Sequence, residues 1–403
     1  MLIACLTVGT VLASYLLLIG SRYKVTVRSQ AWNAAVPVME AGIEEAMTHV
    51  HNDANSPSAN GWTADILSGL QVYWKQRTFS DGSYFRATIY NATSNNPIIY
   101  SAGFVPSPLQ TNKYISRVVK VTGSQTPLLY VAFGAINNIQ MNGNGLAANS
   151  FNSSDPALST NGQYDPSKTT TNGSVASVFG PVDIGNHSIA GNLYLGPTAS
   201  STVPAGQVSG TIYNNYNVDF PDVVLPTTTW LPAATTSGGG KKGSQIHDFA
   251  VSGDYYVNDS LDIQVEPGVS VRLRVDTTSF SPGNVNILST NGTSGTLTAY
   301  QVSGSGSMAG NVTVQSGRAR NLFYYGLPGV TSITYGGNSS FIGVIYAPEA
   351  DLTLNGGGNN NGLIGSSVTK TITMNGHYNF HFDEDLLSSG PSRGFTVTSW
   401  QEQ

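Results

Sequence analysis

An Asn-Gly phrase recurs in this chain at a fixed spacing. Asn355 in LTLNGG lies twenty residues before Asn375 in ITMNGH, and residues 139–145, IQMNGNG, repeat the wording. About twenty residues is the length of one coil of a parallel β-helix, where equivalent residues of successive coils form ladders. Asparagines aligned in this way can hydrogen-bond along the ladder. The repeat therefore predicts a parallel β-helix over residues 128–386, with a β-sandwich as the alternative.

Other features of the composition also favour a mainly β chain. Gly343 and Gly362 are nineteen residues apart, close to the same period. Charged residues make up only 10% of the chain and there are 45 glycines, so long helices are not expected over most of it. Hydrophobic residues, at 40%, are numerous enough to form an ordered core.

Charge and cysteine content exclude several functions. The formal net charge is −5 and no basic run is present, so nucleic acid is not an expected partner. The single cysteine, Cys5, allows neither an intrachain disulfide nor a thiolate-rich metal site. Packing and backbone pairing must therefore stabilise the fold.

Residues 2–19, LIACLTVGTVLASYLLLI, carry no charge. As a helix rising about 1.5 Å per residue they span roughly 27 Å, close to the thickness of the hydrocarbon core of a membrane. The run is a membrane helix or a long signal core. Its cations, Arg22, Lys24 and Arg28, follow the run, whereas a secretory signal carries them before it. We therefore expect a retained single-pass anchor, with membrane lipid as a partner.

The cations and the remainder of the chain predict opposite orientations. Cations after the helix would hold the following chain in the cytoplasm, but the bulk of the chain has an extracytoplasmic character. A longer natural start, with a basic leader upstream of Met1, is the hypothesis that reconciles the two. The expected location is the inner membrane, with the bulk of the chain in the periplasm or at the cell surface.

The helix is expected to continue through residues 1–52 as one amphipathic element, kinked at Pro37. Apolar residues recur every three or four positions after the membrane run. This stripe is the candidate surface for assembly with other subunits, or it covers the sheet that follows. Its residues are Trp32, Val36, Met39, Ile43 and Met47.

Residues 53–127 are predicted to form a small antiparallel sheet. Four segments between Gln71 and Gly123 alternate with a period of two, namely LQVYWKQRTF, YFRATIYNA, PIIYSAGFV and KYISRVVKV. Asp81 and Gly82 between the first two are a strong hairpin signal. A four-stranded meander follows from this pattern.

A long apolar N-terminal helix followed by such a sheet resembles the type IV pilin architecture, and AGIEEAMTHV is similar to the helix of minor pilin-like proteins. The resemblance covers about the first third of the chain. It implies an anchored helix-plus-sheet layout and other pilin-like subunits as partners. The membrane segment lacks the glutamate that pilins use for assembly.

The later region resembles an uncharacterised group of bacterial membrane-anchored, pilin-like envelope proteins. The phrases that carry this resemblance are AFGAINNIQMNG, STNGQYDPSKTTTNGSVAS, GPVDIGNHSIAGNLYLGP, FIGVIYAPEADLTLNGGG and TMNGHYNFHFDEDL. The resemblance implies layout and location, and it implies no known activity.

The stretch TMNGHYNFHFDED, residues 373–385, is the main candidate for a metal site. As a helix it would place His377 and His381 on one face, but its alternation predicts a strand, in which they stand roughly 13 Å apart and cannot share a zinc ion. His381 and Asp383 could share a weak ion. The acids Asp383, Glu384 and Asp385 either bind calcium or form an acidic end that caps the last coil, with the histidines on a polar strand face.

Residues 387–403 are expected to be a C-terminal tail.

Carbohydrate processing is the enzymatic alternative, because polysaccharide lyases and hydrolases often use a β-helix. Such sites need convergent acids and bases. The candidates are Asp259, Asp262, Glu266, Arg272 and Arg274, which more often make solvated pairs in strands. Tyr216, Tyr255 and Tyr256 could stack on sugars or pack between coils.

The sequence therefore predicts a non-enzymatic, membrane-anchored protein of the cell envelope. It would be a pilin-like or surface-display and adhesion component without catalytic residues or a cofactor. Surface glycans are a further expected partner, and the alternative is a β-helix that binds or processes polysaccharide.

Overall fold

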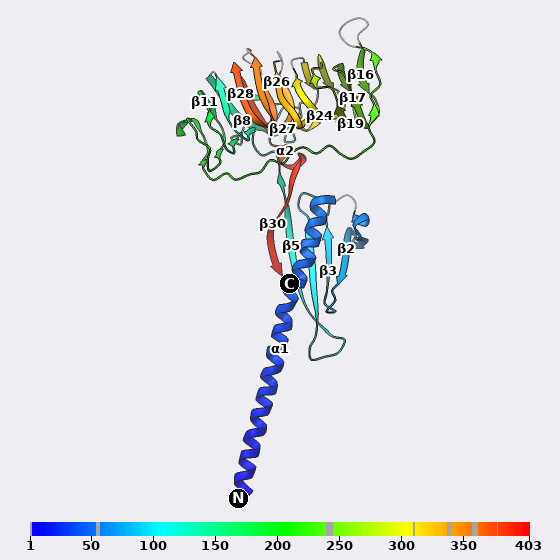
Figure 1. Ribbon diagram of the computed structural model, residues 1–403, viewed down its shortest axis with the longest axis vertical. Helices are drawn as coiled ribbons and strands as arrows, with labels where there is room; N and C mark the ends of the chain where they lie inside the picture. The colour runs from blue at the N-terminus through cyan, green and yellow to red at the C-terminus, as the bar shows by residue number, and fades with distance from the viewer. Residues whose placement is uncertain are drawn as a thin grey trace. The chain divides into compact units, whose positions relative to one another are not determined.

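The computed structural model describes residues 2–53, 57–142, 144–238, 245–308, 311–336, 340–356, 362–376 and 378–403. The fold is mainly β, with a long N-terminal helix, a small antiparallel sheet and a large parallel sheet (Figure 1). The chain forms two compact units. The helix–sheet unit contains residues up to Thr126 together with Ser392–Gln403, and the parallel-strand unit contains Pro127–Pro391.

Among its described residues, the helix–sheet unit has one α-helix, a short 3-10 helix and a six-stranded sheet in the order β1-β2-β3-β4-β5-β30. The antiparallel pairings from β2 to β5 confirm the predicted four-stranded meander, and the Asp81 hairpin joins β2 to β3 as predicted. Two edge strands, β1 and β30, were not predicted. The elements are α1 (Leu2–Asp53), η1 (Pro57–Asn60), β1 (Thr63–Leu67), β2 (Leu70–Thr78), β3 (Tyr84–Tyr90), β4 (Ile98–Pro106), β5 (Tyr114–Pro127) and β30 (Ser392–Glu402).

The C-terminal half of α1 packs closely on this sheet. Its buried face consists mostly of small and aliphatic residues, including Ala35, Met39 and Ile43. On the sheet side, Gly103 leaves room for the helix backbone, because a Cβ there would lie 2.5 Å from the carbonyl oxygen of Ala35. The buried hydroxyl of Ser101 donates a hydrogen bond to the carbonyl of Met39 at 2.7 Å. Helix and sheet therefore approach through a small residue and a polar one, while α1 continues through Pro37.

The residues assigned to a C-terminal tail contain regular structure. They include most of α2 (Leu386–Ser389) and the whole of β30, which is the edge strand next to β5. The backbone N–H of Gln403 donates to the carbonyl of Val118 at 3.0 Å, and the Thr398 hydroxyl donates to the carbonyl of Thr122 at 3.1 Å. These partners run in opposite directions along the two strands, as in an antiparallel pair. Phe395 packs against the core of the unit.

In the described part of the parallel-strand unit there are one large sheet, whose strand pairings are parallel, and two smaller sheets. The large sheet comprises β6 (Phe133–Ala135), β7 (Ile139–Asn142), β8 (Asn144–Phe151), β9 (Val175–Ser177), β10 (Val182–Asp183), β11 (Asn186–Ile189), β12 (Leu193–Leu195), β13 (Ile212–Tyr213), β14 (Leu231–Pro232), β17 (Gly253–Val257), β19 (Ser270–Val275), β20 (Ser279–Phe280), β24 (Thr296–Ser307), β26 (Leu322–Tyr335), β27 (Phe341–Gly356), β28 (Gly362–Gly376) and β29 (Asn379–Asp383). The five-stranded sheet comprises β15 (Thr236–Ser237), β16 (Gln245–Phe249), β18 (Asp262–Val265), β21 (Asn284–Ile287) and β25 (Asn311–Val314), and β22 (Ser289–Thr290) pairs with β23 (Thr293–Ser294). Short 3-10 turns are η2 (Pro166–Lys168), η3 (Ala205–Gln207) and η4 (Ala319–Asn321).

The chain enters and leaves this unit in the middle of the large sheet. The first strands, β6 and β7, pair with β28 near the end of the chain, and β8 pairs with β29. From there the chain builds outward through β9 to β13. Residues 214–230 then connect to β14 at the other end of the sheet, and the remaining strands return toward the start (Figure 1). The backbone N–H of Leu128 accordingly reaches the carbonyl of Pro391 at 2.9 Å.

The predicted asparagine ladder is confirmed. Asn375 pairs in register with Asn355 on one side and with Asn142 on the other. Its side-chain amide donates to Asn355 Oδ1 at 2.9 Å, and the Asn142 amide donates to Asn375 Oδ1 at 3.1 Å. The glycine alignment was wrong: Gly343 pairs with Gly365, twenty-two residues on, because a register shift between Ala347 and Asp351 separates the two halves of β27.

One row of paired residues crosses the large sheet beneath the 214–230 connection. Most side chains toward the two ends of the row are bulky, and those near its centre are small. The small side chains leave space for the 214–230 connection. A Cβ on Gly134, at the centre, would lie 3.8 Å from the ring of Phe220, and the Tyr346 hydroxyl donates to the Pro221 carbonyl at 2.7 Å. In order, the row is Pro232, Tyr256, Arg274, Tyr300, Tyr325, Tyr346, Val368, Gly134, Ala176, Tyr194 and Tyr213.

Candidate functional site

The stretch that ends in three acids forms strand β29, as its alternation predicted. Phe380 and Phe382 are buried in the core, so the inward aromatic face is confirmed. The opposite face is not the solvated polar face that we expected, because His381 is only 8% exposed and Asp383 is fully buried. Neighbouring chain segments cover this face. His377 lies outside the described residues.

The carboxylates of the acidic triplet accept hydrogen bonds from the protein itself. Asp383 accepts from the backbone N–H groups of Ser153, Asp385 and Ala319 at 3.0, 3.2 and 3.3 Å. Burial nevertheless raises the pKa of Asp383, and the hydrogen bonds from Ser153 and Asp385 oppose the rise. The acid therefore joins the segments around residues 153 and 319 to the end of β29.

The other two acids make similar connections. Glu384 accepts from the Thr170 hydroxyl and from the side-chain amide of Asn172. Asp385 lies 3.2 Å from the guanidinium of Arg320, and it also accepts from the Ser154 hydroxyl. Among the described residues, no group of three or more His, Cys, Asp and Glu side chains is arranged to hold a metal ion.

His381 belongs to a closed polar cluster. Its Nδ1 is hydrogen-bonded to Asn149 Oδ1, and the Asn149 amide donates to the Tyr164 hydroxyl at 3.1 Å. The Tyr164 ring stacks on the imidazole with a centroid separation of 3.8 Å. Burial lowers the pKa of His381 to about 4, so the ring is neutral near pH 7. Because Asn149 Oδ1 is an acceptor, the Nδ1–H of the ring donates this hydrogen bond.

The predicted carbohydrate-processing residues do not converge on one site. Each of them contacts a partner close by. For the two arginines this partner is an aspartate, which agrees with the expected solvated pairs. Arg272 makes a two-point contact with Asp254, and Arg274 pairs with Asp276 at 2.7 Å. The acids have separate partners too: Asp259 contacts His247, Asp262 accepts from Asn284, and Glu266 accepts from Gln264.

The three candidate tyrosines have packing partners within the unit. Tyr216 is buried between Tyr130 and Tyr194, with centroid separations of 6.4 and 5.4 Å. Tyr255 packs on Phe249, and Tyr256 lies 5.3 Å from the guanidinium of Arg274.

The five residues of the predicted assembly stripe have different environments. Met39 and Ile43 are buried against the sheet of their own unit, and Val36 and Met47 are partly buried there. Trp32 is 46% exposed, with the Arg117 guanidinium 5.2 Å from its ring. Only Trp32 among them presents a large exposed surface.

A large polar cleft in the parallel-strand unit was not predicted. Its volume is about 780 Å³. Two tight turns with the same sequence, Ser-Thr-Asn-Gly, line it at residues 159–162 and 289–292. Both turns place Asn and Gly in the left-handed region, with φ of 54° and 80° in the first and 52° and 79° in the second. The repeated tetrapeptide is the sequence signal that could have indicated this cleft.

The two turns are held against a third segment, residues 315–321. A Cβ on Gly317 would lie 2.5 Å from Gln163 Cγ, so this glycine permits the close approach. On the other side, the backbone N–H of Ser289 donates to Gln315 Oε1 at 2.9 Å. The cleft is therefore built by internal contacts between three loops.

Two arginines line this polar cleft, and their surroundings differ. Arg320 is neutralised by Asp385, which is only 5% exposed. Arg318 is half-buried with its Nε next to Gly162, and no carboxylate of the described residues forms a salt bridge with it. Arg318 is thus the uncompensated charge among the described lining residues, none of which is acidic or aromatic.

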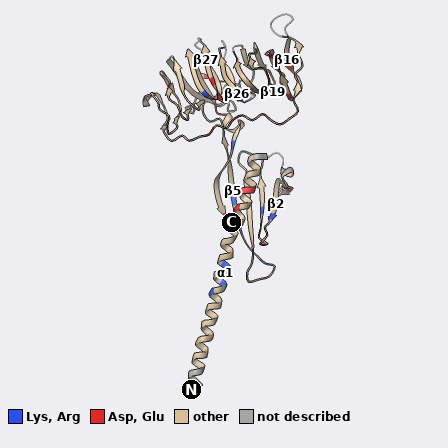
Figure 2. Ribbon diagram, viewed as in Figure 1, with Lys and Arg blue, Asp and Glu red and all other residues tan. Residues whose placement is uncertain are grey.

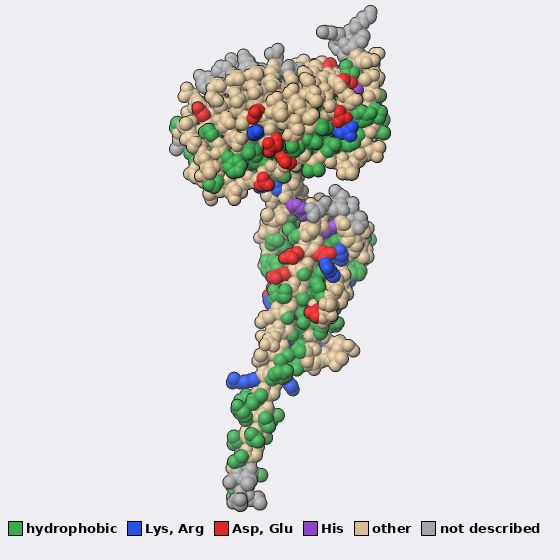
Figure 3. Space-filling view, in the orientation of Figure 1, with side chains coloured by type: hydrophobic (Ala, Val, Ile, Leu, Met, Phe, Trp, Pro, Cys, Tyr) green, Lys and Arg blue, Asp and Glu red, His purple; other side chains and the backbone are tan. Residues whose placement is uncertain are grey.

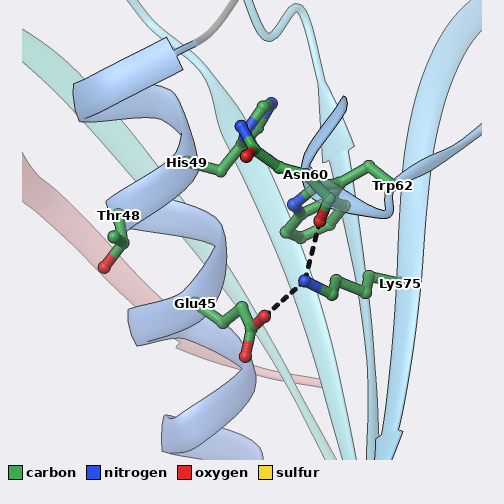
Figure 4. A pocket seen from close by; sticks show the side chains of 6 residues that line it. All are labelled: Glu45, Thr48, His49, Asn60, Trp62 and Lys75. Atoms are coloured by element: carbon green, nitrogen blue, oxygen red, sulfur yellow. Dashed lines mark hydrogen bonds and ion pairs between the residues drawn. The ribbon is translucent and has the colours of Figure 1, made fainter. Parts of the chain in front are cut away.

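A smaller cavity of about 360 Å³ lies in the helix–sheet unit (Figure 4). Lys75 crosses it, contacting Glu45 at 2.6 Å and donating to the carbonyl of Asn60 at 2.9 Å. Burial raises the pKa of Glu45, but hydrogen bonds and charge from Lys75 and Arg77 outweigh this and hold the pKa below its usual value. His49 stacks on Trp62 at the cavity wall. The charged groups here neutralise each other, which indicates a structural role.

The comparisons with known proteins find a family match over part of the chain. A model described as a domain of unknown function, DUF7305, matches residues 233–388. The matched segment includes Arg318, Arg320 and the acidic triplet, while the first Ser-Thr-Asn-Gly turn lies before it. Neither the curated proteins nor the solved structures contain a match to the chain.

Proposed function

We propose that this protein is a non-enzymatic, pilin-like component of the bacterial cell envelope. The N-terminal part of α1 anchors it in the inner membrane, and the parallel-strand unit is displayed on the extracytoplasmic side. In this proposal the parallel strands stack as a β-helix that serves as a rigid surface for contact and adhesion.

The observation that carries the proposal is the division of α1 into two parts. By length and composition, α1 could cross a membrane, and none of its most apolar stretch is buried within the protein. Exposed large apolar residues recur between Ile3 and Ile19, and hydrophobic side chains gather on the described part of this end of the helix in Figure 3. Further along, Met39 to Val50 pack on the sheet. One half of the helix thus needs an apolar environment that the unit itself does not supply.

Basic residues mark the proposed membrane surface. The basic side chains of α1 follow its apolar end, and the first acid of the chain is Glu40 (Figure 2). Arg28 and Lys113 line a cavity of about 190 Å³ together with Tyr114, which is 46% exposed. Arg22 and Lys24 follow Ile19 by three and five residues, about 4.5 and 7.5 Å along a helix, which is the depth of lipid headgroups if the apolar run fills the hydrocarbon core. Arg28, about 13.5 Å beyond Ile19, then lies on the water side of that layer.

The repeat geometry supports stacking. Parallel pairings at spacings of about twenty residues join β26, β27 and β28, and the asparagine ladder runs across β27, β28 and β7. A non-enzymatic role is supported by the engagement of each candidate acid and base in a separate local contact.

A cysteine-labelling experiment tests the location. The single Cys5 is replaced with Ser, and the exposed Thr211 is changed to Cys as the only thiol. We expect a membrane-impermeant maleimide to label Thr211→Cys in intact spheroplasts, and the protein to stay with membranes during alkaline extraction. Labelling only after lysis would contradict the extracytoplasmic placement, and release by alkali would contradict the anchor.

A second experiment tests pilin-like assembly. In the same Cys5→Ser background, Trp32→Cys places a thiol on the exposed side of α1, and Met39→Cys places one against the sheet as the matched control. We expect oxidation to cross-link copies carrying Trp32→Cys and to leave the Met39→Cys protein monomeric. A failure of Trp32→Cys to cross-link would favour a lone anchor.

A further inference from the structure

The polar cleft of the parallel-strand unit is lined mainly by hydroxyl, amide and guanidinium side chains. Its volume of about 780 Å³ lies in the range of pockets that enclose small organic ligands. Hydroxyl and amide side chains provide most of the lining, from residues such as Ser289, Thr296 and Gln315. These groups both donate and accept hydrogen bonds, and they match the hydroxyl groups of a sugar.

Arg318 gives the cleft one place for negative charge. A guanidinium binds a carboxylate through two parallel hydrogen bonds, and this pairing is stronger than contacts between neutral groups. Arg320 is already committed to Asp385. The acids near the first Ser-Thr-Asn-Gly turn are engaged in local hydrogen bonds. Asp165 accepts from Thr160 and Ser167, and Asp155 accepts from the backbone N–H of Ala157. A ligand with one carboxylate among many hydroxyls therefore fits best.

The loops that form the cleft are ordered by contacts within the protein. Lys168 donates to the carbonyls of Pro156 and Ser159 at 3.0 and 2.7 Å, which fixes the base of the first turn. The Ser316 hydroxyl donates to Asn321 Oδ1 at 3.0 Å, and the Asn321 amide donates to the Gly295 carbonyl at 2.9 Å. A preformed site loses less entropy on binding than a flexible one.

We propose that this cleft binds an oligosaccharide that contains a uronic acid, with the Arg318 guanidinium contacting the sugar carboxylate. In this proposal the two Ser-Thr-Asn-Gly turns, which both line the cleft, contact the sugar hydroxyls. A peptide fits less well, because the described lining residues offer no aromatic side chain and only Pro156 as an apolar one. The inference concerns the parallel-strand unit and is independent of whether α1 lies in a membrane.

Calorimetric titration of the full-length protein in detergent tests the proposal. The probes are a β-1,4-linked mannuronate trisaccharide, the neutral β-1,4-mannotriose of the same length and linkage, and inorganic phosphate. We expect the acidic trisaccharide to bind at least about tenfold more tightly than either of the others, because only it combines charge with hydroxyl groups. Equal affinity for the neutral sugar, or tighter binding of phosphate, would overturn the proposal, as would no binding of the acidic sugar.

Variants of Arg318 identify the contact. Arg318→Ala is expected to weaken binding of the acidic trisaccharide at least about tenfold, while Arg318→Lys keeps the charge and recovers part of the affinity. Arg272→Ala, which removes an arginine that does not line the cleft, is the matched control and should bind like wild type. Unfolding temperatures establish that each variant is folded, and Arg318→Gln replaces Arg318→Ala if the latter is not. Unchanged affinity in a folded Arg318 variant would refute the assignment.

Discussion

The carboxylate of Glu402 accepts two hydrogen bonds from the guanidinium of Arg117, each 2.6 Å long. The two residues are 285 positions apart in the sequence. Their contact joins the last strand of the chain to β5 within the helix–sheet unit. The chain thus leaves this unit after Thr126, forms all of the parallel-strand unit, and returns to complete the first sheet.

The return strand should matter far more than its ion pair. Glu402→Gln is expected to lower the free energy of unfolding of the helix–sheet unit by no more than about 1 kcal/mol, because Glu402 is 44% exposed. Deletion of residues 392–403 should cost more than about 2 kcal/mol, because it removes Phe395 from the core and leaves β5 as an edge strand. Hydrogen exchange of the β5 amides measures both effects. Wild-type protection in the deletion variant would show that β30 is dispensable.

The asparagine ladder predicts a dependence on position. Asn375 takes part in two ladder hydrogen bonds, whereas Asn355 and Asn142 take part in one each. We expect Asn375→Ala to lower the free energy of unfolding by about 1–2 kcal/mol and each end variant by about half as much. Urea unfolding of the three single variants compares them directly. Equal losses at all three positions would mean that the ladder bonds do not set the stability.

The buried histidine predicts a pH dependence. Because the pKa of His381 is about 4 in the folded protein and about 6.5 in an unfolded chain, the unfolded chain binds an extra proton between these values. The free energy of unfolding should therefore fall as pH drops from about 6.5 to about 4, by up to about 3 kcal/mol, and the contribution should be constant below that.

The control for this prediction is His381→Gln, which cannot titrate. Burial raises the pKa of Asp383, so that residue has the opposite effect and stabilises the fold as pH falls. Subtracting the variant's free energy of unfolding from that of wild type at each pH isolates the histidine. A difference that stays constant from pH 7 to pH 4 would contradict the neutral, buried state of His381.

The close packing of α1 on its sheet predicts a sensitive glycine. Gly103→Ala should lower the free energy of unfolding of the helix–sheet unit by about 1–3 kcal/mol, because the new methyl group would meet the backbone of Ala35 and Met39. Gly20→Ala is the matched control, since no atom lies within 4 Å of its added Cβ. Thermal unfolding of the two variants should differ, and similar unfolding temperatures would argue against this tight interface.

Local patterns in the sequence predicted most of the elements near the N-terminus. Alternation with a period of two identified β2 to β5, and the Asp-Gly pair located the turn at Asp81, because these signals act within a few residues. The Asn355–Asn375 ladder was also predictable, since equivalent positions of a regular repeat face the same neighbours. The alignment of Gly343 failed because a register shift inside β27 makes the spacing between paired residues of β27 and β28 twenty-two at Gly343, whereas it is twenty at Asn355.

The sequence by itself determined the apolar helix, the antiparallel meander, the parallel repeat and the inward aromatic face of β29. The tertiary structure alone decided that the chain enters the large sheet at its middle, because β7 and β28 are separated by more than two hundred residues and only their pairing brings them together. The tertiary structure also decided the burial of Asp383, because the segments around residues 153 and 319 cover this acid and donate hydrogen bonds to it. The polar cleft has the same origin: hydrogen bonds and close packing between distant loops place two turns of identical sequence beside Arg318, and no local pattern specifies those distances.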